Sequence, residues 1–190
     1  MADVTPGEFI SLYPDLIPRA IRVYNDIKNL TGLEMRPTEG VRTFSRQASL
    51  YAQGRTKPGS IVTNAKAGYS LHHYGCAFDS CFVGTDPYLK KNPLKSDIFR
   101  AFGRLAEAHG FVWGGDWDGD GDESDQTLYD TPHLQLTYGL ALPDMIALYK
   151  AGGMKRVWER FDSVRGAPLG QDWTGPQPRS IIPEMGPFPS

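Results

Sequence analysis

Two histidines and one aspartate carry the strongest chemical signal in the sequence. His72 ends a polar loop, Asp79 lies inside an apolar run, and His133 opens a second run typical of a strand. A carboxylate in an apolar strand is costly unless it is paired or bound to a metal. Two imidazoles and one carboxylate give zinc three ligands and leave a fourth position for water, as in catalytic sites. The spacing equally allows a capped loop histidine and a salt-bridged aspartate.

Asp130 stands shortly before His133, in the segment Asp-Thr-Pro-His. Water bound to zinc becomes acidic near neutral pH, and a neighbouring carboxylate can take its proton. If the zinc site forms, Asp130 is the candidate general base; otherwise it is a turn aspartate. His73 is expected behind the metal site or exposed. His109 falls in the last turn of a predicted helix, where the helix dipole favours a surface imidazole.

An acidic loop over 116–125 repeats carboxylates at alternate positions. Asp118, Asp120 and Asp122 occupy the first, third and fifth positions of a calcium-type loop, and Asp125 is expected to complete the set. Such oxygen ligands suit Ca²⁺, although the glycine and the bidentate glutamate of an EF-hand are missing from their positions. The alternative is a solvated acidic turn. Clustered carboxylates repel one another without a cation, so the sequence predicts a calcium site.

Helices and short strands in mixed order must position these side chains. Apolar residues at helical spacing predict helices over 14–31, 45–54, 96–110, 143–152 and 154–164. Strands are expected over 33–43, 76–83, 111–113 and 131–138. Because strands and helices do not alternate regularly, we predict an α+β fold with a small, largely antiparallel sheet.

Length and composition bound the class of protein. The chain has 190 residues, of which 40% are hydrophobic and 22% charged, as expected for a single globular domain. A net charge of −2 supplies no general basic field for nucleic acid or an anionic membrane. No apolar run approaches the roughly 20 residues of a membrane span. We expect one domain over 1–165 and a proline-rich tail over 166–190.

The two cysteines indicate the compartment of synthesis. Cys76 and Cys81 have an odd separation, which places them on opposite faces of a strand and prevents a disulfide. Unpaired thiols fit a reducing compartment, and the first residues lack the pattern of a secretory signal. We therefore expect synthesis in the cytoplasm. Cys81 shares strand parity with Asp79 and is expected to be a buried core thiol.

The run from Ser70 to Asp79, SLHHYGCAFD, meets all five fixed positions of the pattern S-x-H-x-x-G-x-A-x-D. It resembles the signature of the D-Ala-D-Ala and L-alanyl-D-glutamate metallopeptidases, zinc enzymes that cut peptidoglycan stem peptides. Segments 40–43 and 47–56 resemble the arginine-bearing upstream segment of this family. Segments 113–117 and 130–135 resemble the closing motif of the endopeptidase branch, which includes many bacteriophage endolysins. The resemblance covers roughly residues 10–140.

The resemblance implies three zinc ligands, which are His72, Asp79 and His133. It also implies that Asp130 is the general base and that Arg42 lies near the scissile carbonyl, where its charge would stabilise the developing oxyanion. Ser70 and Gln47 would contact the substrate. From the residues alone, Arg42 would be assigned to a surface ion pair and Ser70 to a turn.

By this resemblance the protein is a single-domain zinc peptidase with a hedgehog/D-Ala-D-Ala-peptidase-like fold. It would cleave the L-Ala–D-Glu bond of peptidoglycan. Branches that remove D-alanine usually carry glutamate in place of Asp130, which favours the endopeptidase. The alternatives are a D,D-carboxypeptidase or dipeptidase at the same site and, in another class, a non-catalytic, metal-stabilised wall-binding or virion structural protein.

The resemblance to phage endolysins also implies partners and a location. The expected substrate is bacterial peptidoglycan, with no nucleic-acid partner and no stable membrane insertion. A monomeric endolysin would be made in the host cytoplasm and released to the cell wall by a holin-type pore. Some phage endopeptidases of this branch carry a calcium loop between the same motifs. Calcium in this chain would order Asp130 and His133.

Overall fold

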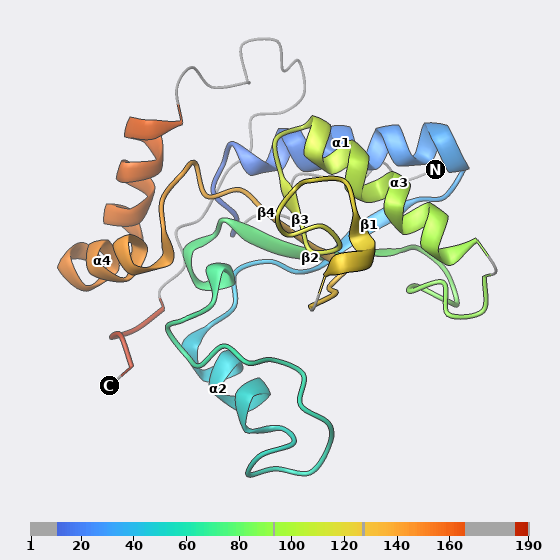
Figure 1. Ribbon diagram of the computed structural model, residues 1–190. Coiled ribbons are helices and arrows are strands. Elements are labelled where there is room, and N and C mark those ends of the chain that lie inside the picture. The colour runs from blue at the N-terminus through green and yellow to red at the C-terminus, as the bar shows by residue number, and fades with distance from the viewer. Residues whose placement is uncertain (1–10, 93, 127, 166–184, 190) are drawn as a thin grey trace.

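The computed structural model describes residues 11–92, 94–126, 128–165 and 185–189. Within these ranges, four strands form one antiparallel sheet in the order β1-β2-β4-β3 (Figure 1). The strands are β1 Met35–Glu39, β2 Ala77–Phe82, β3 Val112–Trp113 and β4 His133–Gln135. The helices are α1 Leu16–Thr31, α2 Phe44–Ala52, α3 Lys95–Ala108 and α4 Leu142–Val164, with short 3₁₀ helices η2 Leu71–Tyr74 and η3 Glu123–Asp125. The predicted α+β class is confirmed.

One face of the sheet packs against α1 and α3, which lie side by side above it in Figure 1. Tyr24 of α1 hydrogen-bonds Ser80 of β2 at 2.7 Å, and the ring of Phe99 in α3 packs against Phe82 at 5.3 Å between centroids. Successive side chains of a strand point to opposite faces. Asp79 is therefore directed away from the helical layer, toward the face that carries the candidate site.

The other elements frame that face. α2 and the loop after it extend away from the sheet, and α4 lies at one end of it (Figure 1). Trp158 of α4 donates to the carbonyl of Tyr74 at 2.9 Å and so anchors α4 against η2. The backbone of α4 is non-helical at Gly152 and Gly153. The predicted division of this segment into two helical parts is confirmed.

Local boundaries differ from the predictions where side chains or turns intervene. The second helix begins at Phe44 because the side chain of Thr43, and not that of Ser45, accepts a hydrogen bond from the helix N-terminus. The strand expected over 131–138 is shorter, because residues 131–132 form a turn closed by the N–H of His133 on the carbonyl of Asp130. The 3₁₀ helix η2 was not predicted, since four residues are too short to show helical periodicity.

Most of the predicted tail, residues 166–184 and 190, lies outside the described residues, so the boundary after residue 165 stays a prediction. Residues 185–189 are described and lie against the domain, with Met185 buried. Cys76 and Cys81 are both buried and free, as predicted. Among the described helices, none combines the length and apolarity needed to cross a bilayer.

Candidate active site

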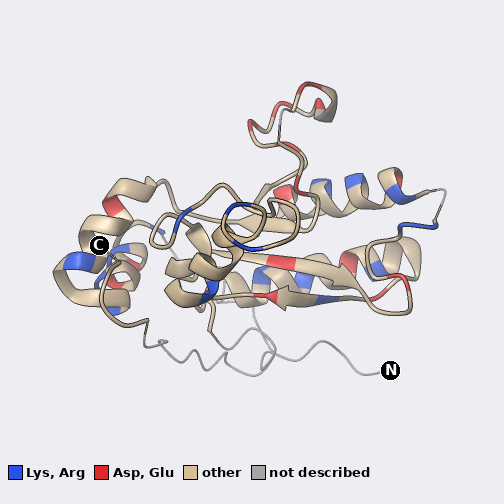
Figure 2. Ribbon diagram, turned by 90° about the horizontal axis from the view of Figure 1, so that it is seen from below, with Lys and Arg blue, Asp and Glu red and all other residues tan. Residues whose placement is uncertain are grey.

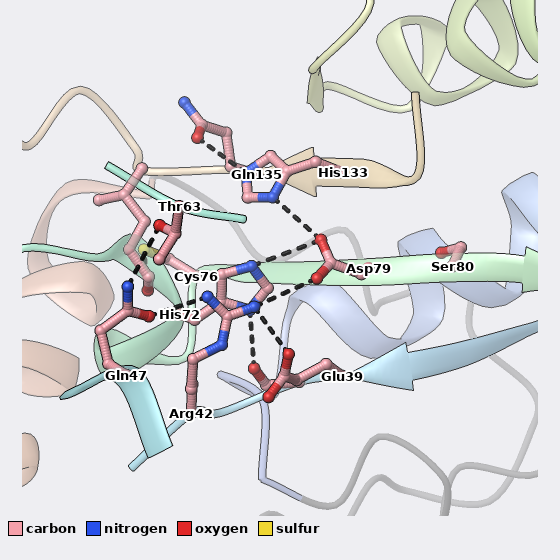
Figure 3. A network of polar contacts seen from close by, with 12 residues as sticks. Glu39, Arg42, Gln47, Thr63, His72, Cys76, Asp79, Ser80, His133 and Gln135 are labelled. Carbon is pink, nitrogen blue, oxygen red and sulfur yellow. Dashed lines mark hydrogen bonds and ion pairs between the residues drawn. The ribbon is translucent and has the colours of Figure 1, made fainter. Parts of the chain in front are cut away.

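Strand pairing brings Asp79 and His133 together. In the antiparallel register of β2 and β4 the two residues are direct partners, and Asp79 Oδ1 lies 3.2 Å from His133 Nδ1. His72 enters from η2, with Nε2 at 3.4 Å from the same oxygen. Figure 3 shows both imidazoles turned toward this carboxylate. The ligand atoms of the three residues all lie within 4.8 Å of one another, so they form a group that could hold a metal ion.

The geometry of this group fits a tetrahedral ion. Zinc bonds of about 2.0–2.2 Å at tetrahedral angles place neighbouring ligand atoms about 3.3–3.6 Å apart, close to the observed 3.2 and 3.4 Å. His72 Nδ1 donates to the carbonyl of Gly40 at 2.9 Å, so that its other ring nitrogen, Nε2, faces Asp79. His133 Nε2 lies 3.1 Å from Gln135 Oε1, so that its Nδ1 faces the same carboxylate. Such outer hydrogen bonds fix the tautomer and the orientation of metal-binding histidines.

Asp79 is held in its ionised form. Burial would raise its pKa, but hydrogen bonds from His133 and His72 hold the pKa of this carboxyl well below its ordinary value. Burial acts to lower the pKa of His133, and the hydrogen bond and charge of Asp79 overcome this and raise it. The group therefore contains a permanent anionic ligand between two imidazoles.

Arg42 reaches the same carboxylate from the segment after β1. Its Nη2 lies 2.8 Å from Glu39 Oε2 and 3.3 Å from Asp79 Oδ2, while Nη1 donates to Gln47 Oε1 at 2.9 Å. Arg42 is only 9% exposed, and its Nε has no hydrogen-bond partner among the described residues. The surface ion pair considered from the residues alone is therefore wrong. Figure 3 shows the guanidinium among Glu39, Gln47 and Asp79, and Arg42 lines the groove around the site.

Gln47 lies inside the protein, beside Arg42. Its side chain is fully buried, and its Nε2 donates to Ala65 O at 2.6 Å and Thr63 Oγ1 at 3.3 Å. Both ends of the amide are used within the protein, and Gln47 orients Arg42; the expected substrate contact of Gln47 stays a prediction. Ser70 does line the groove, with 8% of its surface exposed.

Asp130 lines the groove beside the three candidate ligands. Its N–H donates to Gly114 O at 2.7 Å, and the N–H of Gly114 donates to His133 O at 3.0 Å. A Cβ at Gly114 would lie 2.4 Å from Asp130 O, so the absence of a side chain allows this close approach. Asp130 is exposed as a whole residue, but its carboxyl is partly removed from water, and this burial raises its pKa. The neighbouring His133 lowers the pKa of Asp130, and the charge of Asp79 raises it further.

The groove around the site has a volume of about 800 Å³. Its polar floor contains Arg42 and the three candidate ligands. Its walls carry exposed apolar side chains, which include Ile61, Val62, Tyr69, Tyr88 and Leu128. A groove of this size and mixed character can hold an extended peptide segment while polar groups fix its orientation.

His73 supports the site from behind. It is fully buried, so the exposed alternative is wrong. Its Nδ1 donates to Arg42 O at 2.6 Å, and its Nε2 accepts from the N–H of Gly68 at 3.0 Å. Burial lowers the pKa of His73 to about 4, so the ring is neutral. No fixed motif position marks His73 or Glu39, so the sequence did not predict their partners; the contact of Gln135 with His133 was not predicted either.

The acidic loop groups a different set of carboxylates from the predicted one. Asp116, Asp118 and Asp120 have oxygens within 4.8 Å of one another. Asp122 instead accepts from Ser124, and Asp125 accepts from the side-chain amide of Gln126. Figure 2 shows the acidic residues of this loop on a projection from the body of the fold.

Asp116 is the buried member of that set and was not predicted. Its Oδ2 accepts from Arg104 at 2.6 Å and from the N–H of Gly121 at 3.0 Å, and its Oδ1 accepts from the N–H of Gly119 at 3.0 Å. The loop is therefore organised around an internal ion pair between Asp116 and Arg104, without any ion being required.

The segment that carries the site matches a known class of peptidases. Residues 63–136 match the family Peptidase_M15_4, described as D-alanyl-D-alanine carboxypeptidase. This range contains His72, Asp79, Asp130 and His133. Over this range, the match agrees with the family resemblance that the motif indicated.

The name of one curated relative states a specific peptidase activity. The chain is 38% identical over 112 residues to the peptidoglycan L-alanyl-D-glutamate endopeptidase CwlK of Bacillus subtilis strain 168. The match covers 55% of this chain and 62% of the length of CwlK.

Three solved structures also align with the chain, at lower sequence identity than CwlK. The L-Ala D-Glu endopeptidase ChiX of Serratia marcescens aligns with 24% identity and a TM-score of 0.40, over 70% of this chain and 85% of ChiX. DacB of Streptococcus pneumoniae D39 aligns with 16% identity and a TM-score of 0.48, over 75% of each chain. The LD-carboxypeptidase LdcB aligns with 16% identity and a TM-score of 0.49, over 82% of this chain and 80% of LdcB.

Proposed function

We propose that this chain is a zinc-dependent peptidase that cleaves the L-Ala–D-Glu bond of peptidoglycan stem peptides. The observation that carries the proposal is the convergence of His72, Asp79 and His133 at near-tetrahedral spacing on the floor of a groove that Asp130 also lines. The match to CwlK, whose name states this activity, supports the choice of bond.

The candidate ligands are His72 Nε2, an oxygen of Asp79 and His133 Nδ1. Zinc held there would supply the Lewis acidity that activates water and polarises a peptide carbonyl. Asp130 would accept the proton of the attacking water and pass it to the nitrogen of the leaving amine. The protein around its carboxyl raises the pKa of Asp130, an effect that the charge of a bound cation would oppose.

Arg42 has two roles in this proposal. It holds Asp79 through Oδ2, which keeps Oδ1 directed at the two imidazoles. Its positive charge at the floor of the groove would also stabilise the negative oxygen that develops on the attacked carbonyl. The buried contacts of Arg42 with Glu39 and Gln47 preorganise the guanidinium for both tasks.

The cellular setting belongs to the same proposal. The protein would be a monomeric phage endolysin, made in a host cytoplasm and admitted to the peptidoglycan by a holin-type pore. The resemblance of segments 113–117 and 130–135 to the branch that contains many endolysins supports this setting.

Calcium binding by the acidic loop is a separate proposal. Its support is the grouping of Asp116, Asp118 and Asp120, together with the exposure of the last two. The ion pair between Asp116 and Arg104 competes with a cation for the buried carboxylate.

The test of the peptidase is digestion of purified peptidoglycan by zinc-loaded protein, with mass spectrometry of the fragments. A new D-Glu amino terminus is expected. Release of free D-Ala or of a D-Ala-D-Ala dipeptide would overturn the choice of bond in favour of a carboxypeptidase or dipeptidase.

The variant Asp130→Ala separates catalysis from binding. It should keep its zinc and lose turnover by about 10²–10⁴-fold, the usual contribution of general acid–base catalysis. Wall binding without any cleavage by the unmodified protein would instead support the non-catalytic wall-binding or structural alternative.

A further inference from the structure

Residues 185–189, here called the C-terminal strap, pack against the segment that forms one wall of the groove. The ring of Phe188 lies 5.8 Å from Phe44, 6.2 Å from Tyr69 and 6.4 Å from Tyr149, measured between centroids. Lys150 Nζ lies 4.4 Å from the centre of the same ring. Phe188 therefore joins α2, α4 and the loop before η2.

A second anchor fixes the strap against α4. The hydroxyl of Tyr149 donates to the carbonyl of Gly186 at 2.7 Å, and Met185 is buried. Because these contacts lie on either side of Pro187, the strap is held along its length and not only by one ring.

The ring of Phe188 also lies directly against Gly68. A Cβ at Gly68 would lie 2.6 Å from the Cζ atom of Phe188, and the φ of Gly68 is +89°, a conformation that favours glycine. The N–H of Gly68 donates to His73 Nε2, and its carbonyl accepts from Tyr74 Oη at 2.7 Å. The strap thus covers a turn whose two polar backbone groups are both held by η2, the helix that carries His72.

This turn belongs to the groove wall. Tyr69 and Ser70, which follow Gly68, line the groove, as do Thr63, Asn64 and Ala65. Ala65 O also accepts from Gln47, which orients Arg42. A displacement of the turn would therefore alter the shape of the wall and the support of the floor.

We propose that Phe188 is a positioning residue, which fixes the groove wall over residues 63–70 and thereby sets the affinity for substrate without touching the reacting atoms. The effect on affinity rests on the proposed peptidase function. The effect on the wall itself does not, so the two can fail separately.

The test compares Phe188→Ala with Phe188→Leu and with Leu30→Ala, which removes an exposed apolar side chain from α1. In Phe188→Ala, the amides of Gly68 and Tyr69, which donate to His73 and Lys66, should exchange hydrogen about fivefold faster, as expected for loss of an aromatic cluster. The KM for stem-peptide fragments should rise by a similar factor, while kcat changes less than about twofold. Phe188→Leu should restore part of both effects, and Leu30→Ala should produce neither.

Two results would overturn the proposal. Unchanged exchange at Gly68 and Tyr69 in Phe188→Ala would show that the strap does not hold the wall, whether or not the protein proves to be a peptidase. A lower melting temperature with unchanged KM would show that Phe188 contributes only to global stability.

Discussion

Among the described residues, two groups of three side chains could hold a cation, and they differ in how many of their oxygen and nitrogen atoms already have partners. In the first group, His72 and His133 turn toward Asp79, and Gly40 and Gln135 occupy the opposite ring nitrogens. In the second, Asp118 and Asp120 are exposed, and both oxygens of Asp116 are already bonded within the protein.

The difference shows why a run of acidic residues alone is a poor predictor of a metal site. Alternating carboxylates show that oxygen ligands are present, but not which of these oxygens already form hydrogen bonds or ion pairs within the protein. Paired strands, by contrast, fix the position of each side chain relative to its neighbour. Asp79 and His133 therefore meet as partners across 54 residues of chain.

The largest expected effect is the loss of zinc affinity when one candidate ligand of the first group is removed. His133→Ala should lower the affinity for zinc by more than about 100-fold, because even loss of an outer hydrogen-bond partner typically costs about 10–100-fold. Zinc content after dialysis and competition with a chromogenic chelator would measure this. His109→Ala, which changes a histidine paired with Asp26 on the α1–α3 side, should keep the metal. Equal retention of zinc by both variants would contradict the assigned ligands.

A smaller effect is expected from the residue that orients His133. Gln135→Leu should weaken zinc binding by about 10–100-fold, because His133 Nε2 loses the acceptor that fixes its tautomer. Gln135→Glu keeps an acceptor at this position and should bind zinc more tightly than the leucine variant. Identical zinc affinities for all three proteins, measured by chelator competition, would remove Gln135 from the site.

In the second group, Asp116 should matter for stability. Asp116→Ala removes the acceptor of two backbone N–H groups and one of the acceptors of Arg104, which should cost roughly 1–3 kcal/mol of unfolding free energy in urea. Burial would raise the pKa of Asp116, but Arg104 and the N–H of Gly121 bring it below its ordinary value. Its contribution is therefore present above about pH 3.9 and is lost as the pH falls below that. A variant as stable as the original at pH 7 would contradict this role.

The smallest effect is expected from the exposed carboxylates. Asp118→Asn combined with Asp120→Asn should change the unfolding free energy by less than about 0.5 kcal/mol in EDTA. The same variant should lose any calcium-dependent rise in melting temperature that the unmodified protein shows. If calcium does not raise the melting temperature of the unmodified protein, the calcium proposal is wrong.

The sequence predicted the helices, the small antiparallel sheet and the three residues that converge on the candidate metal position. It succeeded there because periodicity defines elements and the fixed motif positions carry ligand chemistry. It did not predict the internal partners of Gln47, because nothing in the local pattern shows that Ala65 and Arg42 use both ends of its amide. It also failed for Asp116, whose burial depends on Arg104 from a different element.

The register of β2 against β4 also has a consequence for biogenesis. Asp79 is opposite His133 only in the correct alignment, and a slip of one residue would turn one of the two side chains to the opposite face of the sheet. An incompletely synthesised or misaligned chain would offer zinc only scattered donors. If the three residues bind zinc, we therefore expect zinc to bind late in folding, after β2 and β4 have paired in the correct register.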